Sequence, residues 1–142
     1  MIALILLLFL NLVILYKTRE PQELLEVREK YRILREHIRD TGNEKYKILI
    51  RPTPITGMKK MKDSVGSNTN KGSEIVVCLD GKTNEIFHVL IHELAHSTVD
   101  EYSHSQEFWN NYIELRDMCV HLGIYQQIPQ KTEFCGQHIQ DK

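Results

Sequence analysis

The chain begins with a segment that is apolar on every side. Residues 2–16 read IALILLLFLNLVILY, in which Asn11 is the only strongly polar residue. A signal peptide would open with Lys or Arg and end at a pair of small residues, and neither feature is present. A helix buried in a soluble core would carry polar residues on one face. The pattern therefore favours a membrane anchor over residues 1–16, although its fifteen apolar residues rise only about 22 Å against a hydrocarbon core of about 30 Å.

Positive charge lies only on the C-terminal side of this apolar run, at Lys17 and Arg19. Basic flanks favour the cytoplasmic side of a membrane. The sequence also contains no N-x-Ser/Thr sequon, which agrees with a cytoplasmic domain. We expect a single-pass N-terminal anchor with the rest of the chain on the cytoplasmic side.

A charged, amphipathic segment follows over residues 20–40. Its apolar positions recur every three or four residues, which predicts a helix, and Pro21 suits the first turn. The helix should end at the Thr-Gly-Asn segment 41–43. Its predicted inward face comprises Leu24, Val27, Tyr31, Leu34 and Ile38.

Three short apolar segments predict strands. Residues 45–51 (KYKILIR) are stopped by Pro52 and Pro54, residues 55–61 form a second candidate, and residues 74–79 (EIVVCL) give the clearest pattern. Between them, residues 66–72 (GSNTNKG) have the composition of a turn.

Two further helices and a tail complete the chain. Thr83 is the expected cap of a helix over residues 83–97, and residues 105–121 form another amphipathic helix that ends at Gly123. The order of elements predicts an α+β fold with a small mixed sheet. We expect an anchor at 1–16, one domain at 17–125 and an irregular tail at 126–142.

Charge and cysteine content narrow the class of protein. The chain has 18 Lys and Arg against 19 Asp and Glu, whereas nucleic-acid binders usually show a basic excess, so nucleic acid is not the expected partner. A local cluster at Lys59, Lys60 and Lys62 fits a solvated loop. The three cysteines form no CxxC pair and indicate neither a disulfide framework nor a cysteine-rich zinc site. Cys78 should lie in a strand core and Cys119 in a helix core.

The candidate chemistry lies at residues 92–96, which read His-Glu-Leu-Ala-His. Residues four apart share one face of a helix, so His92 and His96 can reach the same metal ion. Glu93 is placed to accept a proton from a water molecule on that ion. Imidazole suits Zn²⁺, and three protein ligands leave a fourth position for water, whose pKa the ion lowers toward ~7. The segment predicts a zinc centre with Glu93 as general base. The alternative, two surface histidines on a core helix, is less favoured because a turn, a strand and a capped helix surround the motif.

A third ligand must come from outside the motif. His104 is the preferred candidate, because the segment 97–103 can turn its ring back over the helix. Glu114 on the next helix, Glu101 and Asp100 are the alternatives. His88 lies one turn before His92, but side chains at i, i+4 and i+8 span about 12 Å and cannot surround one ion. We therefore expect His88 to be structural, and the remaining histidines, His37, His121 and His138, to be structural or exposed.

At His92–His96 and at the segment 104–109, His-Ser-Gln-Glu-Phe-Trp, the chain resembles the WLM and SprT-like metallopeptidases. Their signature is HELxH, a short loop, and then H-x-x-x-F on the next helix. The upstream segment 65–75, VGSNTNKGSEI, is similar to the turn and strand before that helix in WLM domains. The resemblance covers roughly residues 20–125. The segment between His96 and His104 is two residues longer than the commonest WLM spacing.

The resemblance implies a minimal zincin fold, zinc bound by His92, His96 and His104, and Glu93 as general base. It also implies a protein or peptide substrate, laid as an extra strand along the sheet edge above the active helix. Proteins of this kind occur in large DNA viruses, which adds a virion membrane to the expected locations. Cellular members of the family degrade proteins crosslinked to DNA, but their additional basic or SUMO- and ubiquitin-binding regions have no counterpart here.

Three functions are compatible with these patterns. The first is a membrane-tethered zinc endopeptidase, in which Tyr102 or Tyr112 is a candidate partner for the oxyanion. The second is a structural protein of a membrane or virion assembly, with capsid or membrane-complex partners, that retains a zinc site. The third is a DNA–protein crosslink protease, which only the lysine cluster supports. The intact Glu93 favours the first, because a structural zinc site needs no base.

Overall fold

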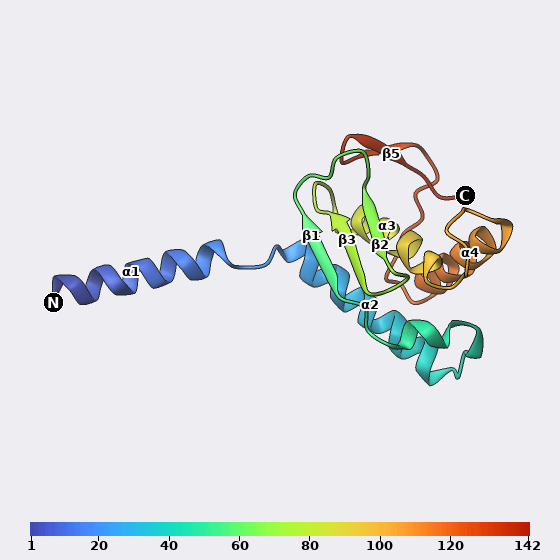
Figure 1. Ribbon diagram of the computed structural model, residues 1–142, viewed down its shortest axis with the longest axis horizontal. Helices are drawn as coiled ribbons and strands as arrows, with labels where there is room; N and C mark the ends of the chain where they lie inside the picture. The colour runs from blue at the N-terminus through green and yellow to red at the C-terminus, as the bar shows by residue number, and fades with distance from the viewer.

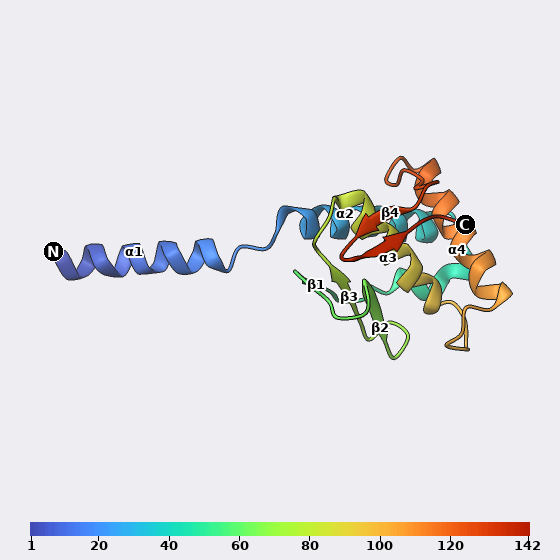
Figure 2. The ribbon, with the colours of Figure 1, turned by 90° about the horizontal axis from the view of Figure 1, so that it is seen from above.

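The computed structural model describes all residues, 1–142, and places an isolated helix beside a packed domain. Helix α1, Ile2–Lys17, buries none of its residues and extends away from the domain in Figures 1 and 2. Phe9, for example, is 65% exposed. No helix has by itself the length and apolar content needed to cross a membrane. Helices α1 and α2 pass such a test only as a pair with a 53° bend between them.

The long amphipathic helix of the domain is where the pattern places it. Helix α2, Gln22–Asp40, begins after Pro21 and buries the five predicted positions of its apolar stripe. Val27, Leu34 and Ile38 are fully shielded from solvent. This part of the prediction is confirmed.

The predicted strand over 45–51 is wrong, because the segment folds as the 3₁₀ helix η1, Glu44–Ile50. The side chain of Asn43 accepts a hydrogen bond from the backbone N–H of Tyr46 and so starts the helix. Tyr46 and Leu49, three residues apart, are its buried residues. The backbone of Tyr46 is itself not helical, with φ −109° and ψ 15°, so η1 consists of two short helical segments that meet at a kink there. The cap at Asn43 and the burial of these two side chains therefore prevail over the strand-like composition.

The sheet has three strands, β1 Ile55–Met58, β2 Gly66–Thr69 and β3 Glu74–Cys78. The order is β1-β3-β2, with β1 parallel and β2 antiparallel to the central β3. Residues 66–69, predicted as part of a turn, form an edge strand instead. The turn itself follows at Asn70 and Lys71, whose φ angles are +46° and +52°. The predicted strand 55–61 ends three residues early.

Two helices follow the sheet and pack on each other. Helix α3, Thr83–His96, lies against the sheet and α2, and α4, Gln106–His121, packs along α3 (Figures 1 and 2). Residue Lys82, not Thr83, precedes the first turn of α3, and its N–H donates to the carboxylate of Glu85, 2.9 Å away. The Thr83 hydroxyl donates instead to Glu26 on α2, so the predicted cap is wrong by one residue.

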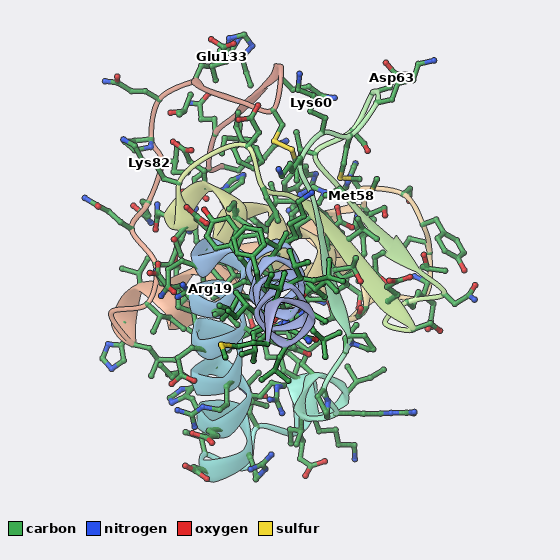
Figure 3. The ribbon with its side chains drawn as sticks, turned by 90° about the vertical axis from the view of Figure 1, so that its left-hand side faces the viewer. Arg19, Met58, Lys60, Asp63, Lys82 and Glu133 are labelled. Atoms are coloured by element: carbon green, nitrogen blue, oxygen red, sulfur yellow. A yellow bond between two sulfur atoms is a disulfide. The ribbon has the colours of Figure 1, made fainter.

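The tail 126–142 is not irregular. Strands β4, Thr132–Phe134, and β5, Gln137–Ile139, form an antiparallel hairpin. A disulfide joins Cys135 in its turn to Cys78 at the end of β3, 57 residues earlier (Figure 3). The prediction that the cysteines form no disulfide is therefore wrong for this pair. Cys78 is nevertheless buried at its strand and Cys119 is a free, buried residue of α4, as expected.

Candidate metal centre

Helix α3 carries two of the candidate ligands on one face. Most of its buried positions are apolar, and Phe87, Leu90 and Leu94 are fully buried. This packing fixes the rotation of the helix about its axis, so His92 and His96 point together toward the open side. Their ring centroids lie 5.1 Å apart.

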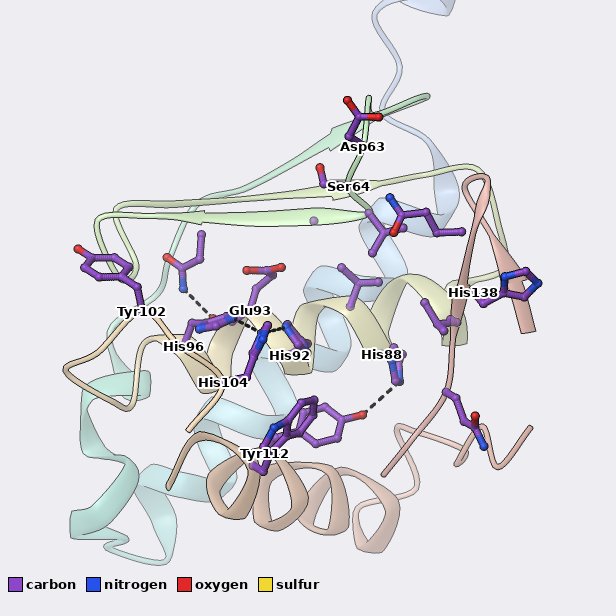
Figure 4. A pocket seen from close by; sticks show the side chains of 18 of the residues that line it. Asp63, Ser64, His88, His92, Glu93, His96, Tyr102, His104, Tyr112 and His138 are labelled. Carbon is purple, nitrogen blue, oxygen red and sulfur yellow. Dashed lines mark hydrogen bonds between the residues drawn. The ribbon is translucent and has the colours of Figure 1, made fainter. Parts of the chain in front are cut away.

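His104 approaches this pair from the segment that follows α3. Its Nε2 lies 3.0 Å from Nε2 of His92 and 3.1 Å from Nε2 of His96 (Figure 4). The candidate ligand atoms of the three residues all lie within 4.8 Å of one another. The structure therefore brings together the three histidines singled out in the sequence, and the group could hold a metal ion.

The surroundings favour the uncharged form of two of these rings, His92 and His96. Burial, helped by the charge of the neighbouring His96 and His104, lowers the pKa of His92 to about 3. Burial, together with His104 and Lys71, lowers the pKa of His96 to about 4. A neutral imidazole has a nitrogen lone pair, and this neutral form of the ring binds metal ions.

An aromatic wall from α4 supports the three rings. Ser105 accepts a hydrogen bond from the N–H of Phe108, which starts α4 directly after His104. The ring of Phe108 lies 4.4 Å from that of His96 and 4.7 Å from that of His104, and the Trp109 ring lies 5.5 Å from that of His104. The wall limits the rotation of the imidazoles.

Glu93 projects from α3 toward the sheet (Figure 4). The residue is only 8% exposed, and burial raises the pKa of its carboxyl to about 7. A side chain on Gly66 of β2 would come within 3.0 Å of its Oε1 and within 2.4 Å of Val89. Glycine at this position therefore lets the edge strand approach the carboxylate closely.

These groups line one cavity of about 580 Å³. Its walls come from residues 63–66 and Asn68 beside or within β2, from the three histidines and Glu93, and from residues 137–140 of the tail. A volume of this size is typical of ligand-binding clefts. The tail residues were not expected here, and His138, predicted to be structural or exposed, is an exposed residue that lines the cavity.

The segment between His96 and His104 is held by the turn between β2 and β3. The ammonium of Lys71 donates to the carbonyls of His96, Val99 and Glu101. The side-chain amide of Asn68 donates to the carbonyl of Glu93 and to the hydroxyl of Ser97. The glycine- and asparagine-rich turn was recognised in the sequence, but nothing in its composition assigned these two roles.

His88 is a structural residue, as predicted. It is 6% exposed, and its Nδ1 lies 2.9 Å from the hydroxyl of Tyr125, 3.2 Å from that of Tyr112 and 3.3 Å from Asp141. Neither tyrosine proposed for the oxyanion is placed by a contact for that role. The hydroxyl of Tyr112 donates its hydrogen to Asp141 and so has none to donate to an oxyanion. Tyr102, the other candidate for the oxyanion, is 75% exposed at the rim of the cavity.

The alternative third ligands are engaged elsewhere. The carboxylate of Glu114 accepts from Lys45 and Tyr46 at 2.7 and 2.6 Å. Glu101 accepts from the hydroxyl of Ser105, and Asp100 is exposed. None of the three belongs to the histidine group.

The comparisons with known proteins find viral relatives of unassigned function. No family model matches the chain. It is 32% identical over 77 residues to the uncharacterized protein R325 of Acanthamoeba polyphaga mimivirus, covering 47% of this chain and 39% of that protein. It is 30% identical over 86 residues to the uncharacterized protein 136R of Invertebrate iridescent virus 6, covering 54% and 48%. The chain thus matches less than half the length of each.

Two solved structures are similar over part of the chain. Wss1 from Saccharomyces cerevisiae has a TM-score of 0.44 at 20% identity and covers 49% of this chain and 59% of its own. The metallopeptidase zymogen of Pyrococcus abyssi, abylysin, has a TM-score of 0.42 at 24% identity and covers 68% and 97%. Likenesses this distant leave the geometry of the three imidazoles as the basis for a functional conclusion.

Proposed function

We propose that this protein is a zinc-dependent metallopeptidase that hydrolyses peptide bonds in a protein or peptide substrate. The observation that carries the proposal is the convergence of three imidazole nitrogens beside one buried carboxylate, Glu93. The resemblance of residues 92–96 and 104–109 to WLM and SprT-like metallopeptidases supports the same conclusion.

The three nitrogens fit zinc better than they fit one another. The Nε2 of a neutral imidazole carries either one hydrogen or one lone pair, so Nε2 of His104 can make a well-aligned hydrogen bond to only one of the two nitrogens beside it. Zinc–imidazole bonds of 2.0–2.1 Å at tetrahedral angles place ligand nitrogens about 3.3 Å apart. The observed separations from His104, 3.0 and 3.1 Å, are close to this value. We assign His92, His96 and His104 as the zinc ligands.

Glu93 is the proposed general base. When bound, zinc supplies a Lewis acid that lowers the pKa of water and polarises the scissile carbonyl. The carboxylate of Glu93 accepts the proton that water loses and delivers it to the departing nitrogen. Its buried position beside the ligands keeps bulk water from competing for that proton.

The free edge of β2 is the proposed docking site for substrate. Strand β2 pairs only with β3, so its other edge faces the cavity, and an extended peptide can add to it by main-chain hydrogen bonds. Gly66 lies over Val89 and Glu93, and Asn68 reaches Glu93 and Ser97, so β2 and α3 run in the same direction. A substrate antiparallel to β2 would run from the His96 end of α3 toward residues 137–140 of the tail. The C-terminal residues of the substrate would then contact this part of the tail.

A lipid bilayer is the proposed location. Helix α1 is apolar all round, buries nothing against the domain and ends at Lys17. Its exposed apolar surface is best shielded by lipid, with Lys17 at the polar interface of the bilayer. A shortfall in length can be met by local thinning of the bilayer or by snorkelling of Lys17.

Glu93→Gln provides the decisive test. The variant keeps the shape of the side chain but cannot accept the proton, so we expect cleavage of an unfolded protein such as casein to fall by about 10²–10⁴-fold. Zinc content should stay at one ion per chain, measured by elemental analysis. Glu44→Gln, at a side chain that is 81% exposed, is the matched control.

Two other results would redirect the proposal. Wild-type protein that contains zinc but cleaves no substrate would indicate a structural zinc site. Wild-type protein without a divalent ion would contradict the assignment of the three ligands.

A further inference from the structure

We propose that Lys71 is the residue that positions His104, and that it thereby sets the metal affinity of the site. The ammonium nitrogen of Lys71 lies 3.3 Å from the carbonyl oxygen of His96, 2.5 Å from that of Val99 and 2.7 Å from that of Glu101. The part that concerns metal rests on the proposed function, whereas the contacts themselves do not depend on it.

The chemistry of lysine matches this task. An ammonium group carries three N–H donors on one nitrogen, and here three carbonyls converge on it. The last carbonyls of a helix have no partner within the helix and bear partial negative charge, so a cation at the C-terminus of α3 is favourable. Lys71 therefore caps α3 and ties the following segment to the helix end.

The base of the Lys71 side chain is itself fixed. The side chain of Asn68 accepts from the N–H of Gly72 at 2.7 Å while its amide donates to Glu93 and Ser97 on the α3 side. The turn that carries Lys71 is thus fastened to the end of the metal-binding helix. The ammonium group acts as a bracket between two parts of the fold.

The segment 97–103 needs such a bracket because its outer part has little packing. Val99 is buried, but Tyr102 is 75% exposed, and Ser103 and His104 are also exposed. The Lys71 ammonium lies 4.5 Å from the centre of the Tyr102 ring, a cation–π contact with this exposed side chain. Without the lysine, three carbonyls lose their common donor. The segment that precedes His104 is then no longer tied to the end of α3.

Hydrogen bonds on the other side of the segment do not replace the lysine. Thr98 bonds to the carbonyl of Ala95 and accepts from Asn111, and Glu101 bonds to Ser105. The bonds of Thr98 lie before the exposed residues 102 and 103. The bond between Glu101 and Ser105 joins the two sides of these exposed residues at the start of α4. Lys71 alone spans from the end of α3, at His96, across to Glu101.

The test is the zinc affinity of Lys71→Met, measured by competition with a chromophoric chelator. Methionine keeps an unbranched side chain but removes the charge and the donors. We expect affinity to fall about 10–100-fold, as for other residues that orient metal ligands. Lys62→Met, at an exposed lysine of the β1–β2 loop, is the matched control and should change affinity less than about 2-fold.

A double-mutant cycle separates positioning from general stability. If Lys71 acts through His104, Lys71→Met should change affinity less than about 2-fold in a His104→Ala background, because the positioned ligand is already absent. An equal loss in both backgrounds would overturn the proposal, as would wild-type affinity in the single variant. Lys71→Arg should restore only part of the affinity, because its planar donors cannot converge on three carbonyls from one point.

A second measurement does not depend on zinc. Hydrogen exchange of the metal-free protein should be faster over residues 97–104 in Lys71→Met than in wild type or Lys62→Met, with α2 unchanged. If wild type binds no zinc but this difference is found, the proposed function fails while the restraint by Lys71 stands. If exchange is unchanged, the inference about Lys71 is wrong whatever the metal result.

Discussion

Two regions of the molecule, the metal end of the cavity and the cluster of the tail around Asp141, are built on opposite principles. At the metal end, His92, His96 and His104 present ring nitrogens that have only one another as hydrogen-bond partners. At the tail end, Asp141 accepts hydrogen bonds from Tyr112, Tyr125 and the backbone N–H of Ile128, and contacts His88. The three imidazole nitrogens lack full hydrogen-bond partners, which a bound ligand can replace, whereas the polar groups around Asp141 have theirs.

The electrostatics of the tail end express the same difference. Burial by itself would raise the pKa of Asp141, but hydrogen bonds from His88, Tyr112, Ile128 and Tyr125 together hold it well below its usual range. Its side chain is only 5% exposed. The carbonyl of Lys142 also accepts a hydrogen bond from Arg116 on α4. Polar groups here serve to fasten the tail, so variants at the two ends should affect different quantities.

The largest effect is expected for His92→Ala at the metal end. Loss of one of three ligands should weaken zinc binding by at least about 100-fold and abolish cleavage. The free energy of unfolding of the metal-free protein should fall by no more than about 2 kcal/mol, because the ring loses its packing against Phe108 and Trp109 but no strong hydrogen bond. Isothermal titration and urea unfolding measure the two quantities, with the exposed His121→Ala as control. A large loss of metal-free stability would mean that the triad is structural.

The disulfide should give the reverse pattern. It closes a loop between residues 57 apart, for which chain entropy gives a contribution of about 4 kcal/mol. Cys135→Ser should lower the free energy of unfolding by that order, while zinc affinity changes less than about 3-fold because Lys71 still holds His104. Adding a reductant should destabilise wild type but not the variant. Equal stability of the two proteins under oxidising conditions would show that the bond does not form.

Asp141→Ala removes the acceptor shared by the tail-end cluster. Two tyrosine hydroxyls and one N–H lose a buried partner, and the expected cost is about 3 kcal/mol of unfolding free energy. Glu133→Ala, at an exposed side chain of the same hairpin, should be nearly neutral. Denaturant unfolding of the three proteins compares them directly. If Asp141→Ala lowered zinc affinity as strongly as His92→Ala, the two ends would not be independent.

The sequence predicts the metal end far better than the tail end, for a physical reason. His92 and His96 are related by helix geometry alone. His104 follows within the same local stretch, which makes it the preferred third ligand over Glu114, Glu101 and Asp100. Asp141 finds its partners on α3, on α4 and after α4, and Cys135 finds Cys78 across 57 residues. Such contacts depend on how the elements pack, and no local pattern encodes them.

The same distinction explains the errors in local structure. Residues 45–51 have the composition of a strand, but the cap at Asn43 and the burial of Tyr46 and Leu49 prevail over it. Lys71 belongs to a recognised turn, yet its three acceptors lie 25 to 30 residues later in the chain. Its role therefore follows from tertiary structure and not from composition.

The pH dependence of stability should sharpen the contrast between the ends. Asp141 has a folded-state pKa below its unfolded value of about 3.9, so its stabilisation is present above that pH and is lost as pH falls toward the folded pKa. Between about pH 4 and pH 2, this group should remove up to about 1.4 kcal/mol of unfolding free energy per pH unit. Asp141→Ala should lack that contribution, so the stability difference between the two proteins should narrow in acid. A constant difference would mean that folding does not lower the pKa of Asp141.

The smallest effect is expected from removing α1, which belongs to neither end. Because α1 buries no residue and extends away from the domain, a chain that begins at residue 20 should unfold within about 0.5 kcal/mol of the full chain in mild detergent. Zinc affinity and peptide cleavage should also be preserved, since every proposed ligand lies after residue 90. Liposome flotation should separate the two, with only the full chain rising with the vesicles. A loss of more than about 1 kcal/mol on truncation would show that α1 packs against the domain instead of serving as a tether.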